Sequence, residues 1–103
     1  MRKSRTGPMV VGVLRMVLYL PENHSLKGKR SVLRAIKSRV SNKFNVSIAE
    51  CGGLDNWQRI SLGVAQAGNE RNHVDRCLRE VAAFISGLGL AEPGEESYEF
   101  DNY

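Results

Sequence analysis

The sequence predicts an α+β domain in which four strands and two helices follow the order β-α-β-β-α-β. Three observations predict it. Two stretches repeat apolar residues at helical spacing, which is typical of helices that pack one face on a core. Four other stretches are either continuously apolar or alternate between apolar and polar residues, as strands do. A Gly-rich turn joins the second and third strands into a hairpin, whereas the helices join the remaining strands.

The first strand is predicted over residues 9–20, which are rich in Val, Leu and Met and precede Pro21. Proline cannot donate a hydrogen bond to a sheet, so the strand ends there. Both faces of this strand are apolar, which favours a central place in the sheet. Ser25 is a suitable N-cap for a helix that ends near Asn42.

Residues 44–51 and 57–67 alternate apolar with polar or small residues. This alternation predicts two strands that are buried on one face only. The connecting residues 52–56 have the sequence GGLDN, a composition typical of turns. The two strands should therefore form an antiparallel hairpin.

The second helix is the clearest element, with apolar residues spaced at i, i+4, i+7, i+11 and i+14 from Val74. Asn69 is the expected N-cap. A short last strand at an edge of the sheet is predicted over residues 97–101. This order of elements predicts a ferredoxin-like fold, a four-stranded antiparallel sheet with both helices on one face.

The chain is predicted to be one domain over residues 9–103, preceded by residues 1–8 as a flexible basic extension or an expression remnant. The basic and then apolar start resembles a signal peptide, but Arg15 interrupts the apolar run and no cleavage pattern follows. The run is also too short to cross a membrane. We therefore expect a cytoplasmic protein without a membrane partner.

Charge is distributed unevenly along the chain. Residues 1–51 contain 11 Lys or Arg and 2 acids, a net charge of +9, and residues 52–103 contain 4 and 9, a net charge of −5. This asymmetry indicates a polyanionic partner for one face. It is equally compatible with attraction within the chain or with head-to-tail association between copies.

The predicted first helix carries most of the positive charge, because residues 24–44 contain seven Lys or Arg and no acid. With about 100° between successive residues, four of them form a stripe beside the apolar face, at spacings i, i+3, i+7 and i+10. The stripe consists of Lys27, Arg30, Arg34 and Lys37, and Lys29 and Arg39 are peripheral to it. Two interpretations remain open, an RNA or phosphate surface and a solvated face whose long side chains cover apolar surface.

The open face of the sheet should be small, apolar and nearly free of charge. It lacks the aromatic residues with which RNA-recognition domains of this topology stack bases. An exposed apolar face of this kind usually marks an interface, so we expect a homodimer or another protein contact there. The interface candidates are Val13, Arg15, Val17, Arg59, Ser61 and Gly63.

The hairpin loop contains two further candidates, Asp55 and Trp57. Asp55 is expected to set an Asx-type turn. Trp57, the single Trp of the chain, either closes the end of the core with its N–H bonded nearby or stacks on a base.

The sequence contains no arrangement of nucleophile, base and oxyanion donors, and we expect a protein that is not an enzyme. No Cys or His spacing indicates a metal site, and no phosphate-loop motif is present. We therefore expect no catalytic residue, metal or cofactor. Cys51 and Cys77 are expected to be reduced, partly buried thiols.

Several stretches together resemble the YlxP-like family, a small bacterial family classed as a domain of unknown function. They are the run from Met9 to Glu50, the motif DNWQR and the strand ISLGVA, and the most specific are SLKGKR at Ser25–Arg30 and D-x-W at Asp55–Trp57. The resemblance covers residues 9 to about 101. The chain differs from the family in residues 1–8 and in the Gly52-Gly53 pair.

The resemblance implies a ferredoxin-like fold. Genes of this family often lie beside those of translation and ribosome-maturation factors, which implies a role in ribosome assembly or translation through contact with ribosomal RNA or a ribosomal subunit. We therefore expect a non-enzymatic accessory protein that contacts structured RNA through its first helix. The alternative is a dimeric protein-interaction or small-ligand regulatory module that uses the open sheet face.

Overall fold

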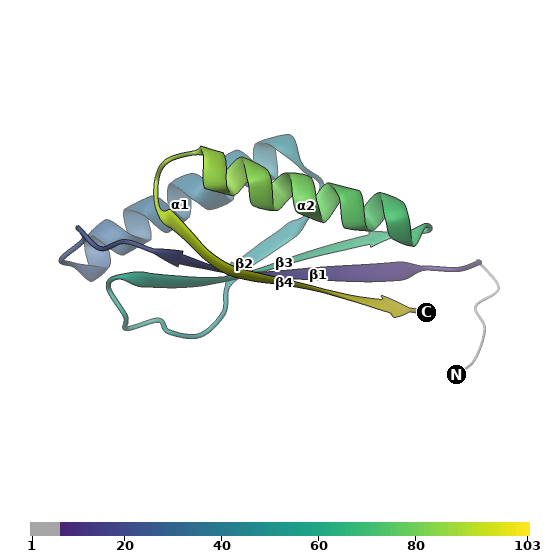
Figure 1. The fold of residues 1–103 in the computed structure, drawn as a ribbon, viewed down its shortest axis with the longest axis horizontal. Coiled ribbons are helices and arrows are strands. Elements are labelled where there is room, and N and C mark those ends of the chain that lie inside the picture. Colours follow the sequence, from purple (N-terminus) through teal and green to yellow (C-terminus); the bar gives the residue numbers. More distant parts are fainter. Residues whose placement is uncertain (1–6) are drawn as a thin grey trace.

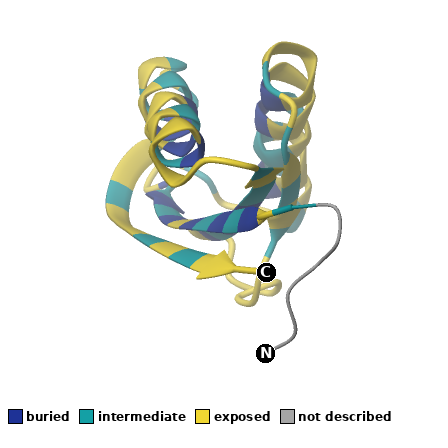
Figure 2. Cartoon of the chain, turned by 90° about the vertical axis from the view of Figure 1, so that its right-hand side faces the viewer, coloured by how far each residue is buried: buried dark blue, intermediate teal, exposed yellow. Residues whose placement is uncertain are grey.

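The computed structural model describes residues 7–103 and confirms the predicted ferredoxin-like architecture (Figure 1). Most of the extension predicted at residues 1–8 lies outside the described residues. The elements are β1 (Val10–Tyr19), α1 (Leu26–Lys43), β2 (Ser47–Glu50), β3 (Arg59–Gly68), α2 (Arg71–Gly87) and β4 (Glu92–Asn102). The sheet is antiparallel with the order β2-β3-β1-β4, and both helices cover one of its faces (Figure 2).

Strand β1 lies in the centre of the sheet, as its apolar composition predicts. It pairs with β3 on one side and with β4 on the other, so that Leu14 lies opposite both Val64 and Tyr98. Leu14, Met16 and Leu18 face the helices and are buried. Between them Arg15 is exposed and Val17 partly exposed on the other face, which no helix or strand of residues 7–103 covers (Figures 1 and 2).

The core lies between the sheet and the two helices. Helix α2 contributes Val74, Leu78, Val81 and Ile85, buried at the predicted helical spacing, and in addition Ala82. Helix α1 contributes fewer fully buried apolar residues, Ile36 and Val40. Neither helix of the described residues is both long and apolar enough to span a bilayer.

Of the two predicted helix N-caps, the one at α1 is confirmed and the one at α2 is wrong. Ser25 caps α1, because its Oγ accepts a hydrogen bond of 3.0 Å from the N–H of Gly28. Asn69 does not cap α2. The cap is the next residue, Glu70, whose longer side chain accepts a 2.7 Å hydrogen bond from the N–H of His73.

Both edge strands differ in length from their predictions. Strand β2 has only four residues, because α1 continues to Lys43 and pairing with β3 begins at Ser47. Strand β4 has 11 residues and pairs with β1 along most of its length, with one irregularity between Met16 and Leu18. Its acidic side chains stay exposed at the edge of the sheet, so their charge does not oppose strand formation.

Candidate nucleic-acid interface

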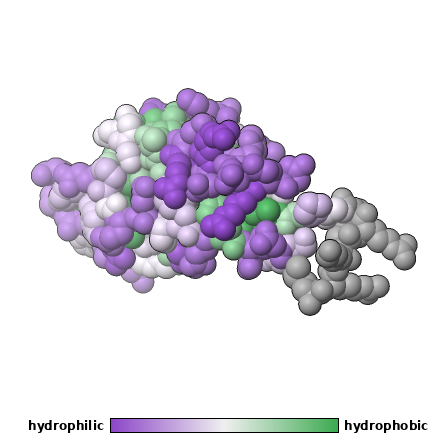
Figure 3. Space-filling model, turned by 45° about the vertical axis from the view of Figure 1, so that its right-hand side comes forward, coloured by the Kyte–Doolittle hydropathy of each residue, from purple (hydrophilic) through white to green (hydrophobic). Residues whose placement is uncertain are grey.

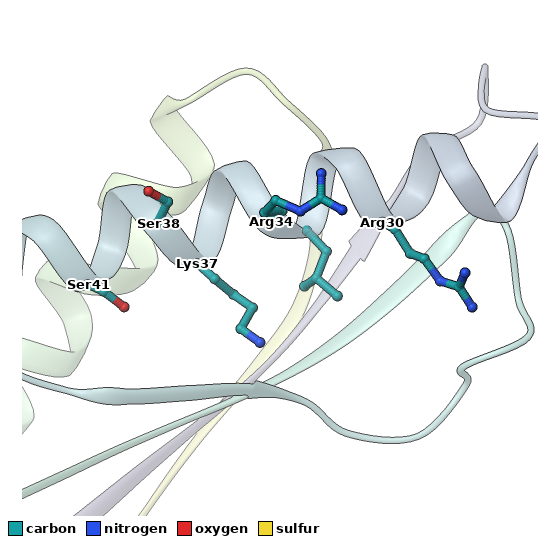
Figure 4. Close-up of a pocket in the computed structure, with 6 residues that line it drawn as sticks. Arg30, Arg34, Lys37, Ser38 and Ser41 are labelled. Atoms are coloured by element: carbon teal, nitrogen blue, oxygen red, sulfur yellow. The ribbon is translucent and has the colours of Figure 1, made fainter.

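Three residues of the predicted basic stripe come together on helix α1. Arg30, Arg34 and Lys37 line a hollow of about 450 Å³, together with Leu33, Ser38 and Ser41. Figure 4 shows that Arg30 and Lys37 extend from α1 in the same direction, with Arg34 between them. None of the six lining residues is acidic. The hollow therefore offers cationic groups and two hydroxyls, which are the donors that hold phosphate oxygens.

The other exposed cations of α1 extend or flank this hollow. Lys27 is exposed on the first turn but is not among the lining residues. Arg39 is exposed on the other flank of the helix, as predicted. Lys43 lies over two aromatic rings, 4.8 Å from the ring centre of Phe84 and 5.7 Å from that of Phe44. Its charge is therefore partly engaged within the chain.

Lys29 does not belong to this surface, and its prediction as a peripheral phosphate contact is wrong. The residue is 1% exposed. Its Nζ lies 2.7 Å from Oε2 of Glu50 and donates to the carbonyl oxygens of Gly53 at 2.8 Å and Leu54 at 3.4 Å. Because a buried ammonium needs such partners, Lys29 joins α1 to β2 and the hairpin loop and is not available to a ligand.

The sequence contains a signal for this buried pair. Lys29 precedes Ile36 by seven residues and Val40 by eleven, so it falls in the middle of the buried face of α1. Glu50 follows Ile48 by two residues, which places it on the helix-facing side of β2. A Lys and a Glu that both point inward from neighbouring elements predict an ion pair.

In the hairpin loop the structure corrects the prediction for Asp55 and excludes one of the two alternatives for Trp57. The Asx-type turn forms at Asn56 instead of Asp55, because the Oδ1 of Asn56 accepts a 3.0 Å hydrogen bond from the N–H of Gln58. Asp55 is exposed. Trp57 does not close the core, because 50% of its surface is exposed. Leu54, which the sequence did not single out, is 62% exposed in the same loop.

The open sheet face contains the predicted interface candidates. Val13, Val17, Ser61 and Gly63 are partly exposed on the face away from the helices. Arg15 is exposed among them, opposite Gly63 on β3 and Ser97 on β4. Arg59 is exposed at the start of β3. The structure thus places the candidates on one surface, distinct from the hollow on α1.

A second hollow lies at one end of the sheet, where the loop after β1 meets the loop before β4. Its volume is about 540 Å³, and its lining includes Tyr19, Pro21, Leu90 and Pro93. The lining is mainly apolar, and Glu22 and Glu92 contribute its acids. It is therefore unsuited to a phosphate and differs in chemistry from the hollow on α1.

Among residues 7–103 no three His, Cys, Asp or Glu side chains lie together so as to hold a metal ion. Both thiols are free, Cys77 partly buried as predicted and Cys51 exposed. Burial and a hydrogen bond to Glu96 raise the pKa of Tyr98 to about 12. That tyrosine packs under Arg79 at the sheet edge, with the guanidinium carbon 4.2 Å from its ring centre.

Known proteins with similar sequences agree with the resemblance. A family described as "Protein of unknown function (DUF503)" matches residues 11–94. The uncharacterized protein YlxP of Bacillus subtilis (strain 168) is 52% identical over 64 residues, which cover 62% of this chain and 70% of YlxP.

One solved structure has a distantly similar shape. It is LarC2, the C-terminal domain of a cyclometallase involved in the synthesis of the NPN cofactor of lactate racemase, in its apo form. The match has a TM-score of 0.40 and 10% identity, and it covers 93% of this chain and 57% of LarC2. The sequence matches decide the family: the chain belongs to the DUF503 family, which is the YlxP-like family that its motifs resemble.

Proposed function

We propose that this protein is a non-enzymatic accessory protein that contacts structured RNA through helix α1. The observation that carries the proposal is that Arg30, Arg34 and Lys37 line one hollow and that none of its lining residues is acidic. Because like charges at these helical spacings destabilise a helix by a few tenths of a kcal/mol per pair, an anionic partner would offset a cost that the free protein bears.

The kind of anion follows from the geometry of the stripe. Lys27, Arg30, Arg34 and Lys37 span three turns of α1, and a helix rises by about 5.4 Å per turn. A row of cations of this length suits successive phosphates of a nucleic-acid backbone better than one small anion. The gene neighbourhood implied by the family directs the first test to ribosomal RNA and to a role in ribosome assembly or translation.

Phosphate contacts of this kind make binding depend on salt. Each phosphate neutralised adds roughly 0.7 to 0.9 to the negative slope of log affinity against log salt concentration. The test is a titration of ribosomal RNA fragments, over a salt series, with the wild type and with an α1 variant that carries Arg30→Gln, Arg34→Gln and Lys37→Gln. We expect the α1 variant to bind more weakly and with a slope shallower by about 2.

A matched control removes three exposed cations from the other helix. The α2 variant carries Arg71→Gln, Arg76→Gln and Arg79→Gln and has the same net charge as the α1 variant. It should keep the wild-type slope to within about 1. Equal losses in both variants would mean that only net charge matters, and equal binding by the wild type and the α1 variant would exclude the α1 surface.

The open sheet face supports a second candidate, a dimeric protein-interaction or regulatory module. Its partly exposed centre around Val17 and Ser61, between the exposed Arg15 and Arg59, is the observation that favours it. A homodimer through this face would leave α1 uncovered, so the two candidates are compatible. A charge introduced at Ser61 would test the dimer without changing α1.

A further inference from the structure

Two of the four large apolar residues that are strongly exposed among residues 7–103 lie in one short loop. They are Leu54, 62% exposed, and Trp57, 50% exposed, between β2 and β3. Trp is the largest apolar side chain, and burying it contributes more free energy than burying almost any other residue. A half-exposed Trp beside an exposed Leu in one loop is therefore a candidate contact for a binding partner.

The backbone of this loop is fastened to the start of helix α1. The buried Nζ of Lys29 donates to the carbonyl oxygens of Gly53 and Leu54. The Nδ2 of Asn23 donates to the carbonyl oxygen of Trp57 at 2.6 Å. Hydrogen bonds thus hold the loop backbone toward α1 while the side chains of Leu54 and Trp57 remain in solvent.

Further hydrogen bonds restrict the loop itself. The N–H of Asn56 donates to the carbonyl oxygen of Gly53 at 3.0 Å, and the side chain of Gln58 donates to the carbonyl oxygens of Pro21 and Asn23. Gly52 and Gly53 have φ values of 81° and 60°, which glycine adopts without strain. A loop held in this way loses little conformational entropy when it binds a ligand.

The position of the loop relates Trp57 to the basic stripe. The segment that holds the loop, residues 23–29, also contains Lys27, and Arg30 follows it directly. Both cations are exposed. Arg30 lies about 100° around α1 from Lys29, whose Nζ holds the loop. A nucleic-acid chain whose phosphates contact Arg30 would therefore pass beside the loop.

The charge of the loop favours a base over a phosphate as its ligand. Between Cys51 and Gln58 the only charged residue is Asp55, which is exposed. A carboxylate repels phosphate but accepts hydrogen bonds from the N–H groups of bases. An aromatic ring beside a carboxylate thus has the chemistry to receive an unpaired base, whereas the α1 hollow has the chemistry to receive phosphates.

We propose that Trp57 is a stacking platform for an unpaired base of the RNA whose phosphates bind to helix α1. This inference rests on the proposed function and adds single-stranded or bulged RNA as the ligand class. Stacking on an aromatic residue contributes about 1–3 kcal/mol per base, which corresponds to about 5- to 150-fold in affinity.

The emission of Trp57 reports directly on the proposal, because the chain has one Trp. The first measurement is fluorescence of the full chain titrated with an unstructured 12-nucleotide RNA and, separately, with inorganic polyphosphate of equal charge. We expect RNA to quench the emission saturably. Polyphosphate should compete for the α1 surface and quench little, since it has no bases.

The second measurement is the affinity of variants for a labelled RNA of the same sequence. Trp57→Ala should lose about 5- to 150-fold in RNA affinity and keep its affinity for polyphosphate. Trp57→Phe should retain part of the RNA affinity, because it keeps an aromatic ring. Leu54→Ala removes the other exposed apolar side chain of the loop and serves as the matched control, with a smaller loss.

The outcomes separate this inference from the proposed function. RNA that binds without quenching, and equally well to Trp57→Ala, would overturn the stacking role and leave the phosphate surface intact. Loss of binding in Trp57→Ala but not in the α1 variant would support stacking and overturn the α1 surface. No RNA binding at low salt would overturn both. A blue shift of the emission with protein concentration alone would make the loop a contact between copies and overturn the stacking role.

Discussion

Lys29 and Glu50 form a buried ion pair that joins helix α1 to strand β2, with Nζ and Oε2 2.7 Å apart. The Lys29 side chain is 2% exposed and the Glu50 side chain 15%. Within residues 7–103, no other donor reaches that oxygen of Glu50. Removing either residue would therefore leave the other charge without its partner. Lys29 also donates to two carbonyl oxygens of the hairpin loop and so helps to position it.

Lys29→Met should destabilise the protein by about 3–5 kcal/mol, because it leaves a carboxylate buried without its cation. Urea unfolding monitored by circular dichroism measures this change. The exposed Lys27→Met is the control and should change stability by less than about 0.5 kcal/mol. A double variant with Lys29→Met and Glu50→Leu should recover much of the loss, because both charges are then removed. No recovery would mean that the bonds from Lys29 to the loop matter more than the pair.

Gly12→Ala should destabilise the core by about 1–3 kcal/mol through overpacking. A Cβ at this position would lie 2.6 Å from Cγ1 of Val74 and 2.8 Å from Cδ1 of Leu78. Gly87→Ala provides the opposite case, because a Cβ there meets no atom within 4 Å and the residue lies in α2. It should stabilise the protein by a few tenths to about 1 kcal/mol, because Ala has a higher helix propensity than Gly. Thermal unfolding of both variants distinguishes the effect of close packing at Gly12 from a general effect of replacing glycine by alanine.

Alkaline pH should destabilise the protein partly through Tyr98. Its pKa is about 12 in the folded protein, whereas an unfolded chain has a tyrosine pKa of about 10. The folded state therefore holds this proton more tightly, and its contribution to stability is complete below pH 10 and is lost as the pH rises toward 12. Melting temperatures of Tyr98→Phe between pH 9 and 11.5 should fall less steeply than those of the wild type. Tyr103→Phe, at an exposed tyrosine, is the control, and an equal slope in Tyr98→Phe and the wild type would contradict the expectation.

Ser61→Glu tests self-association through the open sheet face. If two copies meet there, the buried carboxylates would repel each other, and sedimentation at micromolar concentration should show the variant as a monomer beside a dimeric wild type. Ala83→Glu introduces the same charge at an exposed site on α2 and should leave the dimer unchanged. Gly63 is unsuitable for this test, because a Cβ there would lie 2.8 Å from Sγ of Cys51. A wild type that sediments as a monomer would exclude the dimer at that concentration.

Side-chain periodicity predicted the order of the elements and most of the core, because it distinguishes helix from strand and buried from exposed faces. It also placed Arg30, Arg34 and Lys37 on one stripe, since residues three and four apart share a helix face. The lengths of β2 and β4 could not be derived in this way, because strand length depends on which partner is available for pairing. A one-residue shift of a helix cap from Asn69 to Glu70 likewise depends on which side chain reaches the N–H of His73.

The roles of Lys29 and Trp57 depend on contacts that only the folded chain makes. Residues 24–44 contain seven cations, and helical spacing places Lys29 alone among them on the buried face of α1. The fold decides which groups hold its charge, because Glu50 and the loop carbonyl groups come to it from other elements. Trp57 is large and apolar, as core residues usually are, yet the hydrogen bonds that hold its loop to Asn23 and Lys29 leave its side chain half exposed. Local sequence patterns specify which face of a helix or strand is buried. The partners of a buried charge and the orientation of a loop depend instead on contacts between residues distant in the chain.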